Sequence, residues 1–158
     1  MRDPCDRLAL RYLAAIVCGL LLLMLRGEAA AGSSGPLAVL VPQAPSPWEL
    51  SKLAFWPLVL VWLAGGLRRR GAWTRDLPPV VLVPPAMALA CWGLLAAGGR
   101  GETCLIVWAA FLVMGLAFSP DGSRWPGLWI GLALALGCGY AALTAAPLDW
   151  GPFSVPPG

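Results

Sequence analysis

Glu49 and Lys52 are the two residues whose types and spacing most readily suggest chemistry. They stand three residues apart in SPWELSKLAFWP, residues 46–57, at the start of an apolar run. At that spacing a carboxylate and an ammonium share one face of a helix. Ser46, Pro47 and Glu49 also match a capping box, with an N-cap serine, a proline at the first helical position and an acid at the third. The pair therefore either lines an entry for a solute or ion, or only caps and stabilises a helix.

Other residues with catalytic or metal-binding chemistry are sparse. The chain has no histidine, so it lacks the commonest general acid, general base and metal ligand. GGRGET around Arg100 lacks the lysine and serine of a phosphate loop, and no nucleophile stands beside a base. The cysteines form no C-x-x-C pair and mostly fall inside apolar runs, where thiols act as small apolar groups: Cys5, Cys18, Cys91, Cys104 and Cys138. We therefore predict no catalytic site, no metal and no cofactor.

The composition indicates a membrane protein. Hydrophobic residues make up 59% of the 158 residues, charged residues only 12%, and the mean hydropathy is +0.75. A bilayer core about 30 Å thick needs roughly 20 apolar residues per helix, so the chain has room for about five spans and no soluble domain. The net charge of +3 comes from arginines gathered near span ends, so we expect no nucleic-acid partner. The prediction is an all-α integral membrane protein with a single membrane domain over residues 1–158.

Five apolar runs are candidate transmembrane helices, and a proline-rich tail over residues 147–158 follows them. The first run is also consistent with a signal peptide, because GEAAAG places Ala29 and Ala31 in an A-x-A arrangement before Gly32. Cleavage of residues 1–31 therefore stays open. Pro57 should free the carbonyl of Leu53 and bend the second run, and the pair at residues 84–85 should kink the third. The five runs cover residues 8–25, 47–67, 77–97, 102–119 and 128–146.

Lysines and arginines near the span ends predict the orientation. Eight lie on the side of the N-terminus and three on the other, which places the N-terminus in the cytoplasm and the C-terminus outside a cell (inner) membrane. Glu49 and Lys52 then stand at the outer interface, where we expect an exposed and weak ion pair. Trp48 and Trp150 fall near the outer interface, and the tryptophans at 73, 125 and 129 near the inner one. The eight are Arg2, Arg7, Arg11, Arg68, Arg69, Arg70, Arg75 and Arg124, and the three are Arg26, Lys52 and Arg100.

PQAPSPWELSKLAFWP, residues 42–57, resembles the signature of a family of small, uncharacterised, multi-pass bacterial membrane proteins, a domain of unknown function. The family pattern is P-x-N-E-S-x-W-E-H-x-K-L-x-F-x-P, and its Asn, Glu and His fall here on Ala44, Pro45 and Leu50. LTAAPLDWGPF near the C-terminus resembles the family's closing pattern of a threonine and then a tail with proline and phenylalanine. The resemblance implies this number of spans but no reaction. The matching residues are Pro42, Ser46, Trp48, Glu49, Lys52, Leu53, Phe55 and Pro57.

Small residues recur every four positions in the fifth run and predict a helix-packing seam. Gly127, Gly131, Ala135 and Gly139 would line one helix face, along which two backbones can approach closely in lipid. The seam could pack against another span of the chain, or it could bind a membrane-protein partner or a second copy.

The sequence favours a non-enzymatic integral membrane protein that acts by association with membrane partners or with lipid. An alternative is a small-solute or ion transporter or channel, in which Glu49 and Lys52 line an entry. An intramembrane enzyme would need a nucleophile with a base or a set of metal ligands, and the sequence offers neither.

Overall fold

The chain is all-α over the residues that the computed structural model describes, which are 4–29, 36–44, 46–68, 77–117, 124–146, 148 and 150–153. No strand occurs within these ranges, as the sequence predicted. Six α-helices are followed by a short 3₁₀ helix: α1 (Pro4–Ala29), α2 (Pro36–Leu40), α3 (Pro47–Arg68), α4 (Pro78–Ala96), α5 (Thr103–Ala117), α6 (Pro126–Ala145) and η2 (Gly151–Phe153).

The five long helices coincide with the five predicted apolar runs. Four of them begin at a proline, which has no N–H and so leaves no unpaired donor in the first turn: Pro4, Pro47, Pro78 and Pro126. α1 is longer than its apolar run at both ends, and α2 and η2 were not expected. Arg69, Arg70, Arg75, Trp73 and most of the 147–158 tail lie outside the described residues, as does the region around the possible cleavage site before Gly32.

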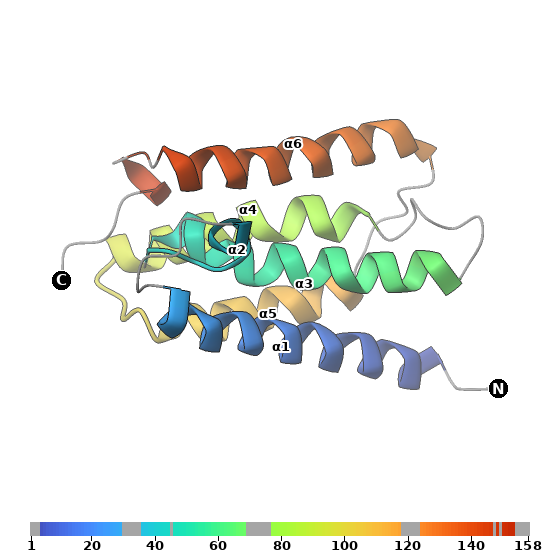
Figure 1. The fold of residues 1–158 in the computed structure, drawn as a ribbon. Helices are drawn as coiled ribbons and strands as arrows, with labels where there is room; N and C mark the ends of the chain where they lie inside the picture. Colours follow the sequence, from blue (N-terminus) through green and yellow to red (C-terminus); the bar gives the residue numbers. More distant parts are fainter. Residues whose placement is uncertain are drawn as a thin grey trace.

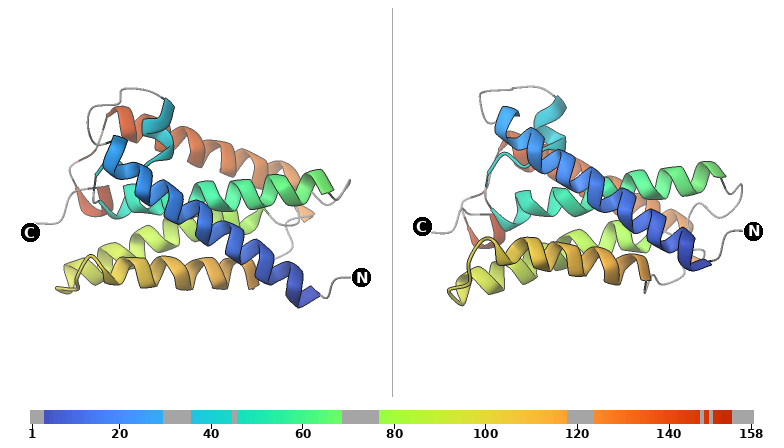
Figure 2. Two further views of the ribbon diagram at one scale, coloured as in Figure 1. Left: turned by 60° about the horizontal axis from the view of Figure 1, so that its bottom comes forward. Right: turned by 90° about the horizontal axis from the view of Figure 1, so that it is seen from below.

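The long helices lie alongside one another and alternate in direction (Figure 1). α3 packs against α1 and α4, α5 packs mainly against α4 and α1, and α6 lies against α4 and α2. α1 runs obliquely to the helices that it covers (Figure 2). The starts of α3 and α5 and the ends of α4 and α6 gather with η2 at one end of the bundle, which we call the η2 end, and α1 begins at the opposite end.

The core lies between α3, α4 and α5. Leu53 and Leu58 of α3, Val80 and Met87 of α4 and Leu112 of α5 are each at most 2% exposed. α6 differs, because Tyr140 is its only buried residue within the described ranges. Most of α6 therefore faces outward.

Pro57 cannot donate to the Leu53 carbonyl of α3, as the sequence predicted, while the bends expected at Pro57 and at residues 84–85 stay predictions. A proline cannot donate to the carbonyl four residues earlier. The Leu53 carbonyl instead accepts a hydrogen bond from the indole Nε1–H of Trp108 on α5, at 2.9 Å, in a buried position. The Trp108 ring lies against Gly19 of α1, where an added Cβ would meet the ring and would stand 3.2 Å from the Leu53 oxygen. Leu53 of α3, Trp108 of α5 and Gly19 of α1 thus lie together around this hydrogen bond. Both α3 and α4 continue as helices through their internal prolines.

α4 and α6 are long and apolar enough to cross a membrane, judged by length and composition over the described residues. The apolar part of α1, Ala9–Leu25, and α5 are shorter apolar helices. Inside the bundle, 44% of the α4 segment is buried, against 6% of the α6 segment. α4 is therefore largely covered by the other helices, whereas α6 lies almost entirely on the outside of the bundle.

Candidate functional site

The start of α3 carries the predicted helix cap. The Glu49 N–H donates to Ser46 Oγ at 3.3 Å, and the Leu50 N–H donates to the Ser46 carbonyl at 3.0 Å. These bonds confirm Ser46 as the N-cap. The Glu49 carboxylate reaches back beyond the helix, where its Oε2 accepts the Gln43 N–H at 2.9 Å. The Glu49 carboxylate therefore holds the chain that leads into α3, in place of the Ser46 N–H that the acid of a capping box would engage.

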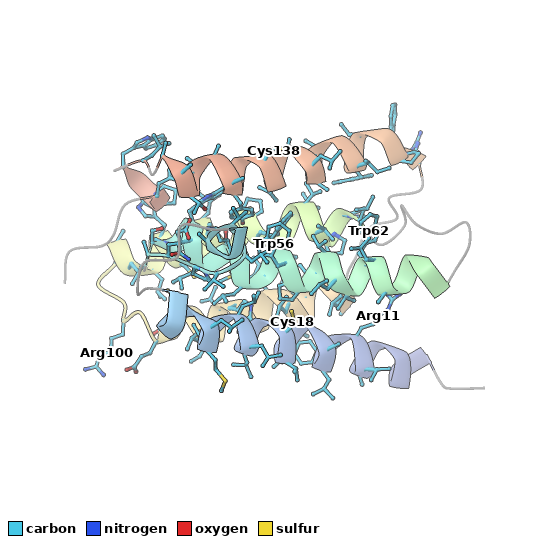
Figure 3. The ribbon with its side chains drawn as sticks, in the orientation of Figure 1. Arg11, Cys18, Trp56, Trp62, Arg100 and Cys138 are labelled. Carbon is cyan, nitrogen blue, oxygen red and sulfur yellow. The ribbon has the colours of Figure 1, made fainter. Side chains whose placement is uncertain are left out.

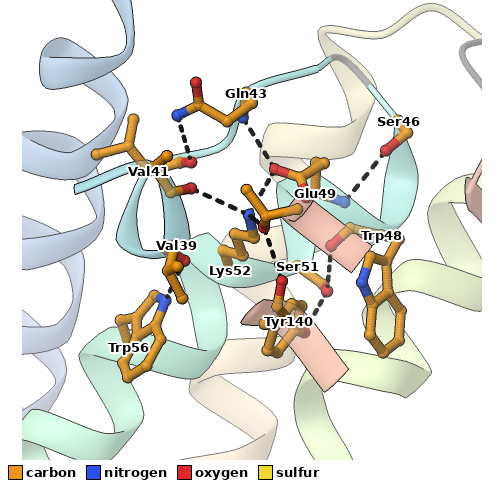
Figure 4. Close-up of polar contacts among 12 residues, drawn as sticks. Val39, Val41, Gln43, Ser46, Trp48, Glu49, Ser51, Lys52, Trp56 and Tyr140 are labelled. Atoms are coloured by element: carbon orange, nitrogen blue, oxygen red, sulfur yellow. Dashed lines mark hydrogen bonds and ion pairs between the residues drawn. The ribbon is translucent and has the colours of Figure 1, made fainter. Parts of the chain in front are cut away.

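Glu49 and Lys52 form a buried ion pair. Lys52 Nζ lies 2.7 Å from Glu49 Oε2, and the exposed fractions of the two side chains are 0% and 9%. The expectation of an exposed pair is therefore wrong. The physical reason is the chain before α3, which folds back over the pair, together with the end of α6, which covers it from the other side (Figure 4).

Each N–H of the Lys52 ammonium has an oxygen acceptor. Besides Glu49 Oε2, Nζ donates to Thr144 Oγ1 at 2.6 Å and, at 3.4 Å, to the carbonyl of Ala38 in α2. The Thr144 hydroxyl in turn donates to the Tyr140 carbonyl one turn earlier in α6, at 2.7 Å. An ammonium has three donors and no acceptor, so these contacts satisfy its charge and its hydrogen bonds together. Lys52 thereby links α2, α3 and α6.

A second link joins α3 to α6 through hydroxyl groups. Ser51 Oγ donates to the Trp48 carbonyl at 2.6 Å and is hydrogen-bonded to the Tyr140 hydroxyl. Because the Ser51 proton is engaged with the carbonyl, Tyr140 is the donor between the two hydroxyls. The Tyr140 ring is fully buried and stacks on Trp48, with ring centroids 4.7 Å apart. We call Glu49, Ser51, Lys52, Tyr140 and Thr144 the polar cluster.

Residues 36–43, which we call the strap, cover the polar cluster (Figure 4). Three hydrogen bonds hold the strap to α3: Lys52 Nζ to the Ala38 carbonyl, Trp56 Nε1 to the Val39 carbonyl at 3.1 Å, and the Gln43 N–H to Glu49. In two of these bonds the strap contributes a backbone carbonyl as the acceptor, and in the third it contributes a backbone N–H as the donor. The strap is therefore held mainly by its main chain, whereas α3 supplies the side chains.

Several residues of the site carried no recognised signal in the sequence. Tyr140 and Thr144 are four apart and so lie on one face near the end of α6, where two hydroxyl groups in an apolar helix could have been taken as a polar contact. Thr144 belongs to the closing part of the family resemblance, and Phe153 of the same part lies 5.1 Å from the Trp48 ring, centroid to centroid. The fold thus brings the opening and closing parts of the resemblance together at the η2 end.

The predicted seam on α6 faces away from the bundle. Gly127, Gly131 and Ala135 are exposed, and a Cβ added at Gly127, Gly131 or Gly139 meets no described atom within 4 Å. Within the described residues, the seam therefore does not pack against another helix of this chain. A partner, a second copy or lipid remains as its possible contact.

Comparisons with models of protein families, with curated proteins and with solved structures find no match to this chain. In chemical terms, the groups of the polar cluster form ionic and hydrogen bonds with one another and with nearby backbone atoms. These bonds hold the strap and α6 against α3.

Proposed function

We propose that this chain is a multi-pass integral membrane protein in which α1, α3, α4, α5 and α6 span the cell (inner) membrane. The observation that carries the proposal is the exposure of large apolar side chains on the outside of the bundle, together with a charged side chain inside it. Leu13, Met24 and Leu134 are 58%, 75% and 66% exposed, whereas Lys52 is fully buried. In water, an extended exposed apolar surface is unfavourable, and so is the burial of a charged group. In a lipid bilayer, the exposed apolar surface is favourable because it contacts acyl chains.

α6 supports the proposal more strongly than α4 does. A buried core helix of a water-soluble protein can be as long and apolar as a span, and α4 is substantially covered. α6 is almost uncovered, and it lies far from the N-terminus, where a signal sequence would be. Water is a poor solvent for its exposed Leu128, Ile130 and Leu134, and acyl chains are a good one.

The proposed orientation places the η2 end outside the cytoplasm. Trp48 and Trp150 both contact Phe153 and so share this end, whereas Trp125 and Trp129 begin α6 at the other end. Indoles prefer the two membrane interfaces, so this distribution is consistent with a span between the two groups. The excess of lysines and arginines on the side of the N-terminus indicates the direction of the spans, with the N-terminus in the cytoplasm.

The proposed role is non-enzymatic and consists of association with lipid or with membrane-protein partners, including a second copy. The outward apolar face of α6 supports this role because it is available for contact along most of its length. The polar cluster would then be an internal fastening that keeps α6 and the strap on the bundle. Its position, where both parts of the resemblance meet, supports the proposed membership of the domain family of unknown function.

Three measurements test this proposal. The protein should stay in the membrane fraction after an alkaline carbonate wash, and an alkaline phosphatase fusion at Gly158 should be active while a fluorescent protein fused there stays dark. The opposite pattern of fusions would mean an even number of spans and would refute the topology. Purification of the tagged protein in mild detergent should retain a partner or a defined lipid, and a protein that carries neither contradicts the proposed association.

A transporter or channel for a small solute or ion is the second candidate function. The buried Glu49–Lys52 pair favours it, because charged residues inside a membrane domain are costly and often mark a transport path. Beside the pair, the Trp48 indole N–H is buried without a hydrogen-bond partner in the described residues. A Glu49→Gln variant that keeps its expression and melting temperature but loses solute flux in vesicles would support this candidate, and unchanged flux would contradict it.

A further inference from the structure

Two buried cysteines are neighbours where α4 and α5 form a hairpin. Cys91 lies near the end of α4 and Cys104 in the first turn of α5, with exposed fractions of 0% and 2%. Both are free thiols in this structure. The Cys91 Sγ lies 4.0 Å from the Cys104 carbonyl oxygen, so the two cysteines are neighbours across the hairpin. Neighbouring cysteines on two packed helices can be joined by a disulfide when their Cα atoms lie within about 7 Å of each other.

The turn between the helices fixes this contact. Gly98 has a positive φ of 83°, a backbone conformation that glycine adopts without strain and that commonly ends a helix. The Gly98 and Gly99 N–H groups donate to the carbonyls of Leu95 and Leu94, which closes the end of α4. The Cys104 N–H donates to the Gly101 carbonyl, which begins α5. The backbone of the turn therefore sets the register of α4 against α5.

The hairpin turn lies at the η2 end of the bundle. Arg100, in the turn, is at the same end as the last turn of α6 and η2 (Figure 3). The proposed topology places this end outside the cytoplasm, in a compartment where disulfides form and persist. The inference therefore rests on the proposed function, specifically on its topology.

We propose that Cys91 and Cys104 form an intramolecular disulfide that links α4 to α5. The oxidant is a disulfide of a thiol–disulfide oxidoreductase in that compartment. One cysteine thiolate attacks this disulfide and displaces the first thiol of the oxidant, and the second thiolate attacks the resulting mixed disulfide and displaces the other. One S–S bond forms in the chain, the S–S bond of the oxidant is broken, and the oxidant takes up two electrons and two protons.

Burial determines when this exchange takes place. Neither sulfur is accessible in the finished fold, so the exchange precedes the packing of α4 against α5. Once the helices have packed, the same burial shields the disulfide from a soluble reductant. The bond should therefore resist dithiothreitol in the folded protein and be reduced readily after denaturation.

The test uses a variant in which Cys5, Cys18 and Cys138 are replaced by serine. Cells are quenched with acid, free thiols are blocked with N-ethylmaleimide in denaturant, and the protein is then reduced and labelled with a polyethylene glycol maleimide. Two labels per chain after reduction, on a protein that is monomeric in a non-reducing gel, support the disulfide. In matched controls with Cys91→Ser or Cys104→Ser, the remaining thiol should be blocked in the first step and take no label.

Two results overturn the proposal: blocking of both thiols before reduction, or a reducible dimer in the non-reducing gel. A reporter separates this failure from a failure of the topology. Alkaline phosphatase inserted after Arg100 should be active if the turn lies outside the cytoplasm. Free thiols with an active reporter refute the disulfide alone, whereas free thiols with an inactive reporter refute the topology and the disulfide with it.

Discussion

The hydrogen bond from Trp108 to the Leu53 carbonyl should depend on the proline at position 57. Trp108→Phe removes the indole donor and leaves a buried carbonyl that Pro57 cannot satisfy. An orphaned buried acceptor costs about 1–3 kcal/mol in water-soluble proteins, and hydrogen bonds between membrane helices average about 0.6 kcal/mol with a maximum of about 1.7. We therefore expect a loss of about 1 kcal/mol in the free energy of unfolding from the hydrogen bond, in addition to the packing change.

A double-mutant cycle isolates the hydrogen bond. In a Pro57→Ala background, the new N–H at position 57 can donate to Leu53, so Trp108→Phe should cost only its packing term. The free energy of unfolding is measured by titration with sodium dodecyl sulfate in mixed micelles, followed by circular dichroism. The coupling energy between the two sites should be about 1 kcal/mol, well above the additivity error of about 0.3–0.5 kcal/mol.

Trp56→Phe is the matched control for this cycle. Trp56 also donates its indole N–H to a backbone carbonyl, but that carbonyl belongs to Val39 in the strap and does not depend on Pro57. Its cost should be the same in both backgrounds. If Trp108→Phe likewise costs the same with proline or alanine at position 57, the carbonyl is satisfied in another way and the reasoning is refuted.

Three further predictions concern the cluster, the helix contacts and the seam. Lys52→Met should destabilise the protein by about 3–5 kcal/mol because it leaves Glu49 buried without its partner, and Glu49→Gln added to it should recover part of the loss; additive costs in thermal unfolding would contradict this. Gly19→Ala should lower the melting temperature, since the new methyl meets the Trp108 ring, whereas Gly93→Ala meets nothing and should be close to neutral; equal effects would exclude a contact at Gly19. Gly131→Leu should leave the monomer folded in detergent and abolish crosslinked oligomers if the seam binds a second copy, whereas unchanged crosslinking would indicate that Gly131 faces lipid.

The helices could be predicted from the sequence because their signals are local. Apolar runs of sufficient length locate the five long helices to within a few residues, and Pro47 marks the first residue of α3. The Ser46 cap could be predicted for the same reason, since its bond spans only three residues. The effect of Pro57 on the Leu53 carbonyl also follows from one helical turn. The donor that replaces the proline, Trp108, could not be identified, because it comes from a helix that is distant in sequence.

The burial of the Glu49–Lys52 pair could not be predicted because it depends on two contacts of long sequence separation. Thr144 reaches Lys52 from 92 residues away, and the Ala38 carbonyl is a main-chain atom whose position no side-chain pattern reveals. Viewed on α3 alone, the pair is an interfacial cap. Covered by the strap and by α6, it is a buried charge pair with every lysine donor engaged. The Glu49–Lys52 pair could therefore be predicted from its own stretch of sequence, whereas its surroundings, which decide how strongly the pair acts, were determined by how the strap and α6 pack against α3.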